Sequence, residues 1–291
     1  KTAFALHLAR QAAMQGHAVT VYSLEMQGER LADRWLLSAG DINPYRWRTG
    51  IPNPHEVAEA HTTAAELARL PIHVDDSTSV NMEHIRSSAR LLQSQHACDA
   101  IIIDYLQLCD MTTGQNNRNR EQEVAMISRS LKAIAKELNI PIIALSQLNR
   151  SVESRGGNKR PQLSDLRESG AIEQDADLVA FIHRPEYYGL TVDEDGAPTQ
   201  GMAEIIVAKH RNGAVDTIKL RFRKEQAKFM DYDDLSGDGY SAMDSSMNTE
   251  FGSAIGGGAG SLDKINDFGG YGEFGIPSGS GSGPGGLGGT F

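Results

Sequence analysis

Cysteine is scarce in this sequence, and the marks of secreted and membrane proteins are missing as well. Cys98 and Cys109 are the only cysteines among 291 residues, and they have no partner spacing for a metal site. There is no signal peptide and no apolar run long enough to cross a membrane. We therefore expect a cytoplasmic protein without a membrane partner. A starting methionine is also lacking, and we interpret Lys1 as the site of a truncation.

Aliphatic runs are nearly absent from residues 231–291. This segment holds 18 of the 30 glycines, nine acidic residues and one lysine, so it contributes −8 of the net charge of −10. Because it cannot bury enough apolar surface to offset its ordering entropy, we predict a disordered, acidic, Gly/Ser-rich tail. Residues 1–230 carry 29 acids and 27 bases, so this body is nearly neutral and compatible with nucleic-acid binding.

Helical and strand patterns alternate along residues 1–230, which predicts one α/β domain with a mostly parallel sheet flanked by helices. We expect helices at 3–15, 29–38, 55–67, 82–94 and 120–138. We expect strands at 18–24, 71–74, 100–103, 141–145, 178–182, 203–209 and 215–223. The last three should complete the sheet, and an Arg-Asn-Gly turn at 211–213 makes the final pair an antiparallel hairpin at its C-terminal edge.

One helix carries a clear buried stripe. In the segment 120–138 the apolar residues step by three and four, which is the spacing of one helix face. They are Val124, Ile127, Leu131, Ile134 and Leu138.

The first two residues match the end of a phosphate-binding loop. Lys1-Thr2 at the first turn of a helix is how the pattern G-x-x-x-x-G-K-[ST] ends, with the lysine reaching phosphates and the hydroxyl binding Mg²⁺. The glycine-rich part is absent, so an arbitrary helix start is the alternative for this dipeptide taken alone.

A Walker B pattern supplies the context. The run Ile-Ile-Ile-Asp at 101–104 is a buried strand that ends in a carboxylate, at the sheet edge where open α/β sheets bind ligands. Asp104 would then hold the shell of a Mg²⁺ ion. The alternative is a strand that ends in a turn aspartate.

Two more polar residues follow predicted strands. Glu25 follows the strand 18–24, where a carboxylate suits polarising a water for in-line attack on a γ-phosphate. Gln147 follows the strand 141–145, and its neutral donor and acceptor suit detection of the γ-phosphate. Each is alternatively a solvated strand end, but several such ends on one sheet edge favour a common site.

Lys209 and Arg211 flank His210 near a predicted turn. Side chains alternate along a strand, so the two cations point the same way and His210 the opposite way. Two cations on one face suit phosphate contact, and a charged, water-exposed hairpin is the alternative. We assign no function to His210.

The segment 149–177 is a long connection without strong periodicity, which indicates a functional or a disordered loop. It has no Phe, Tyr or Trp on which bases would stack. Its cations and glycines therefore favour phosphate contacts that are indifferent to sequence, and a mobile loop with no partner is the alternative. The candidate cations are Arg155, Lys159, Arg160 and Arg167.

Together these segments resemble the C-terminal RecA-like domain of DnaB-type replicative helicases, over residues 1–230. The most specific pieces are SLEM at 23–26, IIIDYLQL at 101–108, LSQLNR at 145–150, LSDLRESGAIEQDAD at 163–177 and AKHRNG at 208–213. The resemblance implies a RecA-like P-loop NTPase core that uses ATP and Mg²⁺. It also implies a homohexamer with ATP at subunit interfaces, single-stranded DNA in the central pore, and primase and a helicase loader as replisome partners.

The resemblance assigns roles to the candidate residues. Lys1 and Thr2 look like the end of Walker A, Glu25 like the catalytic base, Asp104 like the Walker B carboxylate, and Gln147 like the γ-phosphate sensor.

The same resemblance extends to the neighbouring subunit and to DNA. Lys209 and Arg211 look like the pair offered to the adjacent subunit's nucleotide, with Arg211 as the finger. Arg167, Glu168 and Gly170 look like the loop that grips the strand.

We therefore expect a 5′-to-3′ DNA helicase motor driven by ATP. Compared with the family, this sequence lacks the glycine part of the phosphate loop, the strand before it and the N-terminal collar domain. The tail at 231–291 is not part of the family core. Residues 1–291 alone should consequently show negligible ATPase activity. A RecA-class recombinase-like ATPase and a non-catalytic assembly module are the alternatives.

Overall fold

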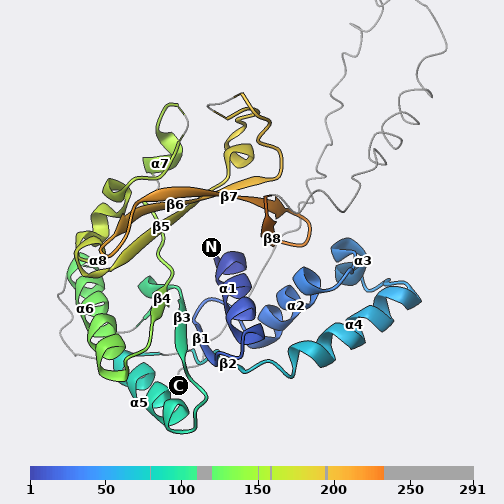
Figure 1. Ribbon diagram of the computed structural model, residues 1–291, viewed down its shortest axis with the longest axis horizontal. Helices are drawn as coiled ribbons and strands as arrows, with labels where there is room; N and C mark the ends of the chain where they lie inside the picture. Colours follow the sequence, from blue (N-terminus) through green and yellow to red (C-terminus); the bar gives the residue numbers. More distant parts are fainter. Residues whose placement is uncertain (79, 110–119, 150, 158, 194–195, 233–291) are drawn as a thin grey trace, which may run out of the picture. The chain divides into compact units, whose positions relative to one another are not determined.

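The computed structural model describes residues 1–78, 80–109, 120–149, 151–157, 159–193 and 196–232, although not the side chains of 167–169. The chain separates into two units, Lys1–Gly237 and Asp238–Phe291. The description below concerns the first unit (Figure 1). The predicted disordered tail at 231–291 lies outside the described residues from position 233 onward.

The helices of the first unit vary widely in length. The α-helices are α1 (Thr2–Met14), α2 (Gly28–Ala39), α3 (Pro44–Thr49), α4 (Pro54–Leu67), α5 (Met82–Ser94), α6 (Arg120–Leu138), α7 (Ser151–Ser154) and α8 (Gly170–Asp175). Short 3₁₀ helices are η1 (Leu106–Leu108), η2 (Leu163–Ser169) and η3 (Pro185–Tyr188). Each of the five predicted helices is confirmed within two residues at either end. The alternation of long helices with strands is that of an α/β domain.

Four strands form a parallel sheet in the order β2-β1-β3-β4. They are β1 (Val19–Ser23), β2 (Ile72–Asp75), β3 (Ala100–Asp104) and β4 (Ile142–Ala144). All three neighbouring pairs are parallel, and the register aligns Ser23 with Asp104. The carboxyl ends of β1, β3 and β4 therefore lie next to one another at one edge.

The remaining strands form a sheet of their own, so the prediction that they complete the first sheet is wrong. β5 (Leu178–His183), β6 (Met202–His210), β7 (Asp216–Arg223) and β8 (Lys228–Asp231) pair antiparallel in that order. Short connections join β6, β7 and β8, and antiparallel pairing needs only such hairpins. The predicted hairpin between β6 and β7 is confirmed, whereas β8 was not predicted.

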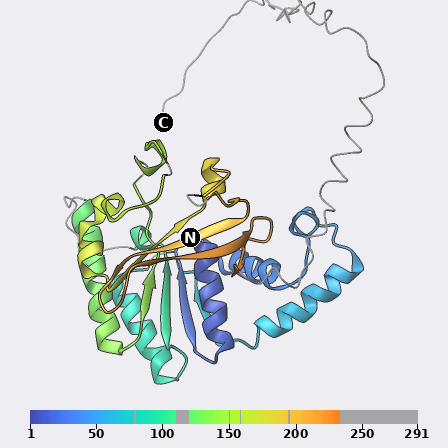
Figure 2. The ribbon, with the colours of Figure 1, turned by 45° about the horizontal axis from the view of Figure 1, so that its top comes forward.

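Helices cover both faces of the parallel sheet (Figures 1 and 2). Side chains alternate along each strand, so Ile101 and Ile103 face α5 and α6, whereas Ile102 faces α1 and α2. The stripe predicted for α6 is confirmed, since all five of its residues are buried. Full burial of one such aliphatic side chain stabilises the fold by about 1.5–3 kcal/mol.

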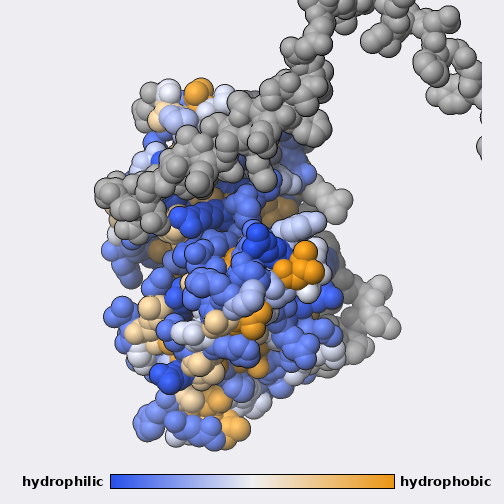
Figure 3. Space-filling model, turned by 90° about the vertical axis from the view of Figure 1, so that its right-hand side faces the viewer, coloured by the Kyte–Doolittle hydropathy of each residue, from blue (hydrophilic) through white to orange (hydrophobic). Residues whose placement is uncertain are grey.

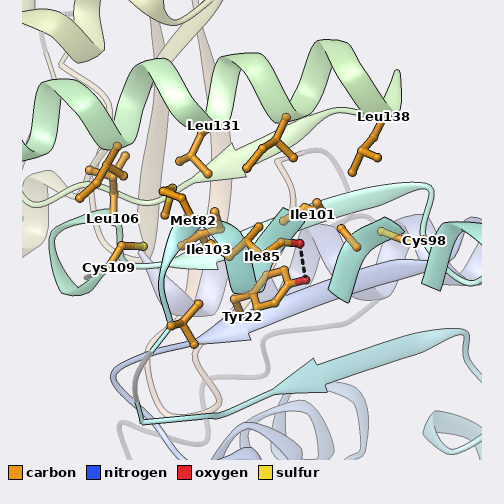
Figure 4. Close-up of a cluster of buried hydrophobic side chains, with 14 of the residues drawn as sticks. Tyr22, Met82, Ile85, Cys98, Ile101, Ile103, Leu106, Cys109, Leu131 and Leu138 are labelled. Carbon is orange, nitrogen blue, oxygen red and sulfur yellow. Dashed lines mark hydrogen bonds between the residues drawn. The ribbon is translucent and has the colours of Figure 1, made fainter. Parts of the chain in front are cut away.

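Figure 4 shows the larger of these clusters between α6, α5 and the sheet. Tyr22 lies within it and donates its hydroxyl proton to the carbonyl oxygen of Ile85 at 3.3 Å, so its one polar atom is satisfied. Both cysteines are buried without forming a disulfide, and both belong to this cluster.

Helix α3 was not predicted, because it has only six residues. Two local signals in the sequence mark this helix, an N-terminal capping residue and a C-terminal glycine. The Asn43 side chain accepts the amide protons of Tyr45 and Arg46, and Gly50 ends the helix in the left-handed conformation with φ of 72°. The side of the molecule that carries α3 and α4 is mainly hydrophilic with scattered apolar patches (Figure 3), and Tyr45, Ile51 and Val57 are exposed there.

The segment 149–177 is more regular than predicted. It holds α7, η2 and α8, each too short to show a helical repeat in the sequence. Leu163 and Leu166 anchor it against Val179 and Phe181 of β5. The lack of periodicity in the sequence therefore did not reveal these short helices. Among the described residues, no helix is both long and apolar enough to cross a membrane.

Candidate nucleotide site

Three strand ends meet at the carboxyl edge of the parallel sheet. The Leu24 amide donates to the Asp104 carbonyl at 2.9 Å, which places Glu25 two residues beyond the end of β1 and beside β3. The Leu145 amide donates to the Ile103 carbonyl at 2.9 Å, which brings the turn after β4 to the same edge. The structure therefore assembles the predicted residues Glu25, Asp104 and Gln147 on adjacent strands.

The start of α1 lies against this edge. Thr2 donates its hydroxyl proton to a carboxylate oxygen of Asp104 at 2.7 Å, and Asp104 is only 4% exposed. The Lys1 ammonium donates to the Ser146 carbonyl at 3.2 Å and lies 5.5 Å from the centroid of the Tyr105 ring. Lys1 and Thr2 thus contact the residues at the ends of both β3 and β4, and they lie at a helix N-terminus, which favours anions.

Two carboxylates, those of Asp104 and Glu25, lie close enough to Lys1 to act on its charge. The pKa of the Lys1 ammonium is lowered, mainly because nearby protein atoms displace part of its water, while Asp104 and Glu25 act in the opposite direction. Both carboxylates are therefore close enough to affect the lysine. The first turn of α1 adds unpaired amides that favour an anion.

Gln107 belongs to the same edge and was missed as a site residue. Its side-chain amide donates to Ser146 Oγ at 2.9 Å and to the Gln147 carbonyl at 3.5 Å. Its side-chain oxygen accepts the Gln147 amide proton at 3.3 Å. The only available signal was its position in the IIIDYLQL segment, three residues after Asp104.

Lys209 and Arg211 are bound to helix α8. Lys209 donates to the carbonyls of Glu173 and Gln174, and Arg211 donates to the Gln174 carbonyl at 2.6 Å. These carbonyls close a helix and lack helical partners, so cations suit them. Both side chains thus reach the same end of α8, although β6 ends at His210 and Arg211 lies in the turn that follows. Their attachment to α8 argues against a hairpin that is merely solvated.

Asp177 is the acidic partner of this group. Its carboxylate lies 3.5 Å from Arg211 and also pairs with Lys132 of α6. The hydrogen bond from Lys132 lowers the pKa of Asp177 most, and the charge of Arg211 lowers it further. The carboxylate therefore stays ionised and holds Arg211 at the end of α8.

Three of the four cations proposed to contact DNA have partners within the chain. Arg155 pairs with the buried Asp165, and Arg160 donates to Thr217 Oγ1 at 3.2 Å and approaches Glu204 at 3.6 Å. Lys159 lies 5.6 Å from the centroid of the Tyr188 ring. These contacts indicate that Arg155 and Arg160 also hold the segment in place.

The rest of the predicted DNA-gripping loop is only partly visible. Gly170 begins α8, whereas the side chains of Arg167 and Glu168 lie outside what the structure describes.

The donors at the edge suit Mg²⁺. This ion prefers oxygen ligands, keeps several waters, and typically binds one or two carboxylates together with substrate phosphates. The Asp104 carboxylate and Thr2 hydroxyl are two such oxygens in direct contact. In the described part of the chain no group of three or more His, Cys, Asp or Glu could hold a metal, and a Mg²⁺–nucleotide site does not require one.

A helix start and polar strand ends at one edge of a parallel sheet place the chain in the class of open α/β domains that bind ligands at the carboxyl ends of their strands. Comparison with known proteins narrows this class, because the DnaB-like helicase C terminal domain family matches residues 1–231. The chain belongs to that family.

Curated proteins that this chain resembles are named as replicative helicases. The chain is 45% identical over 231 residues to the replicative DNA helicase DnaB of Geobacillus stearothermophilus, covering 79% of this chain and 49% of that protein. It is 44% identical to the replicative DNA helicase DnaC of Bacillus subtilis (strain 168), with the same coverage. The chain thus spans about half the length of the curated relatives it matches.

Solved structures agree with the family. The ATPase domain of G40P superposes with a TM-score of 0.73 at 35% identity, covering 80% of this chain and 81% of that one. A DnaB-like replicative helicase, described with its interactions with primase, gives a TM-score of 0.72 at 35% identity, with coverage of 79% and 54%.

Proposed function

We propose that this chain is the motor domain of a replicative DNA helicase, which hydrolyses ATP to translocate 5′ to 3′ on single-stranded DNA and so unwinds duplex. The observation that carries the proposal is the contact of Thr2 Oγ1 with the Asp104 carboxylate at 2.7 Å, beside Lys1 and between the ends of β1 and β4. The relatives named as replicative DNA helicases support this function over a recombinase.

The substrate would be ATP with Mg²⁺. Thr2 and Asp104 would hold the ion, which when bound withdraws charge from the phosphates. Lys1 would bind the terminal phosphates, since its ammonium already lies at this edge. The first-turn amides of α1 would add hydrogen bonds to phosphate oxygens.

Hydrolysis requires a base and an orienting group. Glu25 is exposed beside Asp104, and its carboxylate would take the proton of the water that attacks the γ-phosphorus while the bond to the ADP oxygen breaks. Gln147 would contact the γ-phosphate through its exposed side-chain amide. The products are ADP and inorganic phosphate.

A second subunit would complete the site. Arg211 is exposed at the turn after β6, which leaves it accessible to an adjacent copy. In a homohexameric ring, Arg211 would act as the finger that stabilises charge on the transferring phosphate of the neighbour.

DNA would bind in the centre of such a ring. Arg167, Glu168 and Gly170 precede or begin α8, the helix whose other end holds Lys209 and Arg211. The residues proposed to bind the DNA strand and those proposed to act in ATP hydrolysis would therefore lie at opposite ends of one short helix. Primase and a helicase loader are the proposed protein partners, and the replisome in the cell interior is the proposed location.

The proposal is tested by Lys1→Ala in the full-length protein. We expect ATPase and unwinding to fall at least 100-fold, because the lysine is the only cation among the edge residues described above, and one such electrostatic contact commonly contributes about 10²–10³ in rate. Lys224→Ala, at an exposed turn, is the matched control and should keep both activities. An active, strand-unwinding Lys1→Ala protein would contradict the proposal.

A further inference from the structure

Gln147 sits on a turn whose position is set by another residue. Gln147 is exposed, and among the described residues its hydrogen bonds are made by its backbone amide and carbonyl. Its side-chain amide is therefore placed only as well as its backbone is held. A group that senses a γ-phosphate must be held closely, because misplacement by about 1 Å can cost roughly 100-fold in rate.

The side chain of Gln107 supplies this restraint. Its oxygen accepts the Gln147 amide proton, and its nitrogen donates to Ser146 Oγ and to the Gln147 carbonyl. A carboxamide combines an acceptor and two donor hydrogens in one plane, so it can satisfy this turn from a single position. A carboxylate of the same size has no donor and would repel the Gln147 carbonyl.

The turn that carries Gln107 is itself firmly fixed. Its neighbours Leu106 and Cys109 are each 2% exposed and lie in the core cluster (Figure 4). The Leu106 amide donates to the Leu145 carbonyl at 2.9 Å, and Arg120 at the start of α6 donates to the Gln107 carbonyl. Gln107 therefore joins the end of β3, which carries Asp104, to the turn that carries Gln147.

The same turn also serves Lys1. The carbonyl of Ser146 accepts from the Lys1 ammonium at 3.2 Å, while the hydroxyl of Ser146 accepts from Gln107. Gln147 therefore lies on the same turn as the carbonyl that accepts from the lysine.

We propose that Gln107 is a positioning residue for Gln147, which holds the Ser146–Gln147 turn against β3 at the distance that γ-phosphate sensing requires. The proposal rests on the proposed function, because it assigns Gln107 a part in that ATPase site. Gln107 acts through Gln147 and takes no part in bond breaking.

The experiment measures kcat, KM and nucleotide preference for Gln107→Ala and Gln107→Glu in the full-length protein. The glutamate variant keeps the size of the side chain, so it remains informative if the alanine variant folds poorly. We expect kcat to fall about 10- to 100-fold with a small change in KM. The ratio of affinities for a non-hydrolysable ATP analogue and ADP should move toward one.

Gln93→Glu is the matched control. Gln93 also joins two elements, since its amide donates to the Leu138 carbonyl at 2.6 Å, but it lies between α5 and α6, away from the strand ends of the site. Its loss should change thermal stability and leave kcat and the nucleotide preference unchanged. A general loss of packing would instead affect all three variants alike.

A double-mutant cycle with Gln147→Ala tests whether Gln107 affects kcat through Gln147. If Gln107 works through Gln147, Gln107→Glu causes no further loss of kcat once Gln147 is alanine. Additive losses, or a Gln107→Glu protein with normal kcat and nucleotide preference, would overturn the positioning role. If the Lys1→Ala protein is active, both the proposed ATPase site and the role of Gln107 are wrong. If the Lys1→Ala protein is inactive and the Gln107 variants are unaffected, only the role of Gln107 is wrong.

Discussion

Glu25 and Asp104 end neighbouring strands but meet different surroundings. Asp104 is buried and bound to Thr2, which suits holding a metal ion, while Glu25 is exposed to water, which suits accepting a proton. Glu25→Gln should therefore lower kcat for ATP by about 10²- to 10⁴-fold and leave Mg²⁺–ATP binding nearly unchanged. Steady-state kinetics together with fluorescent nucleotide titration would measure the two effects separately.

The matched control for this variant is Glu29→Gln. Glu29 is also exposed and lies four residues further on, in the first turn of α2. It should retain full activity. If Glu25→Gln lost nucleotide affinity as strongly as it lost turnover, Glu25 would belong to the binding set and the base would have to be sought elsewhere.

The placement of residues at the strand ends was predictable from the sequence, and the contact of Gln107 with the turn after β4 was not. Parallel strands place their carboxyl ends together, so Glu25, Asp104 and Gln147 follow from the strand pattern alone. Gln107 and its partners Ser146 and Gln147 are 39 and 40 residues apart, and nothing local in the sequence marks their contact. Such a contact becomes visible only when two turns are placed side by side.

At the scale of elements, the turn between β6 and β7 is packed by His210. A Cβ added to Gly213 would lie 2.3 Å from Cε1 and 2.4 Å from Nδ1 of the His210 ring. Gly213→Ala should therefore force the ring aside and lower the free energy of unfolding by about 1 kcal/mol. Adding His210→Ala should restore most of the loss, and thermal or urea unfolding would measure both.

Gly156→Ala is the control for that substitution. A Cβ there meets nothing within 4 Å. Its stability should stay within about 0.5 kcal/mol of wild type. A Gly213→Ala protein as stable as this control would show that the ring moves freely and does not pack the turn.

Elements with a long periodic pattern were predicted well, and short ones were not. Helix α6 shows its stripe over 19 residues, whereas α3 and α8 have six residues each, and this is too few to repeat a pattern. The division into two sheets was also missed, because strand composition does not reveal which edges pair. Helix α8 is the most consequential omission, since it binds both Lys209 and Arg211.

At the scale of the whole molecule, the proposed site is divided between copies of the chain. Lys1 contacts the sheet edge, whereas Arg211 contacts Gln174 and Asp177 at the end of α8. A ring with head-to-tail interfaces would bring Arg211 of one copy to Lys1 of the next. Each of Lys1→Ala and Arg211→Ala should then be inactive alone, since each removes one half of every site.

Mixed rings test this division directly. When the two inactive proteins are combined in equal amounts, about one quarter of the interfaces pair an intact Lys1 with an intact Arg211. ATP turnover should therefore reappear on mixing, in proportion to the mixed rings counted by native mass spectrometry. A ring that carries both substitutions in every subunit is the control and should stay inactive. If mixed rings form and no turnover returns, Arg211 does not act across the interface, because at least some sites in those rings have both groups.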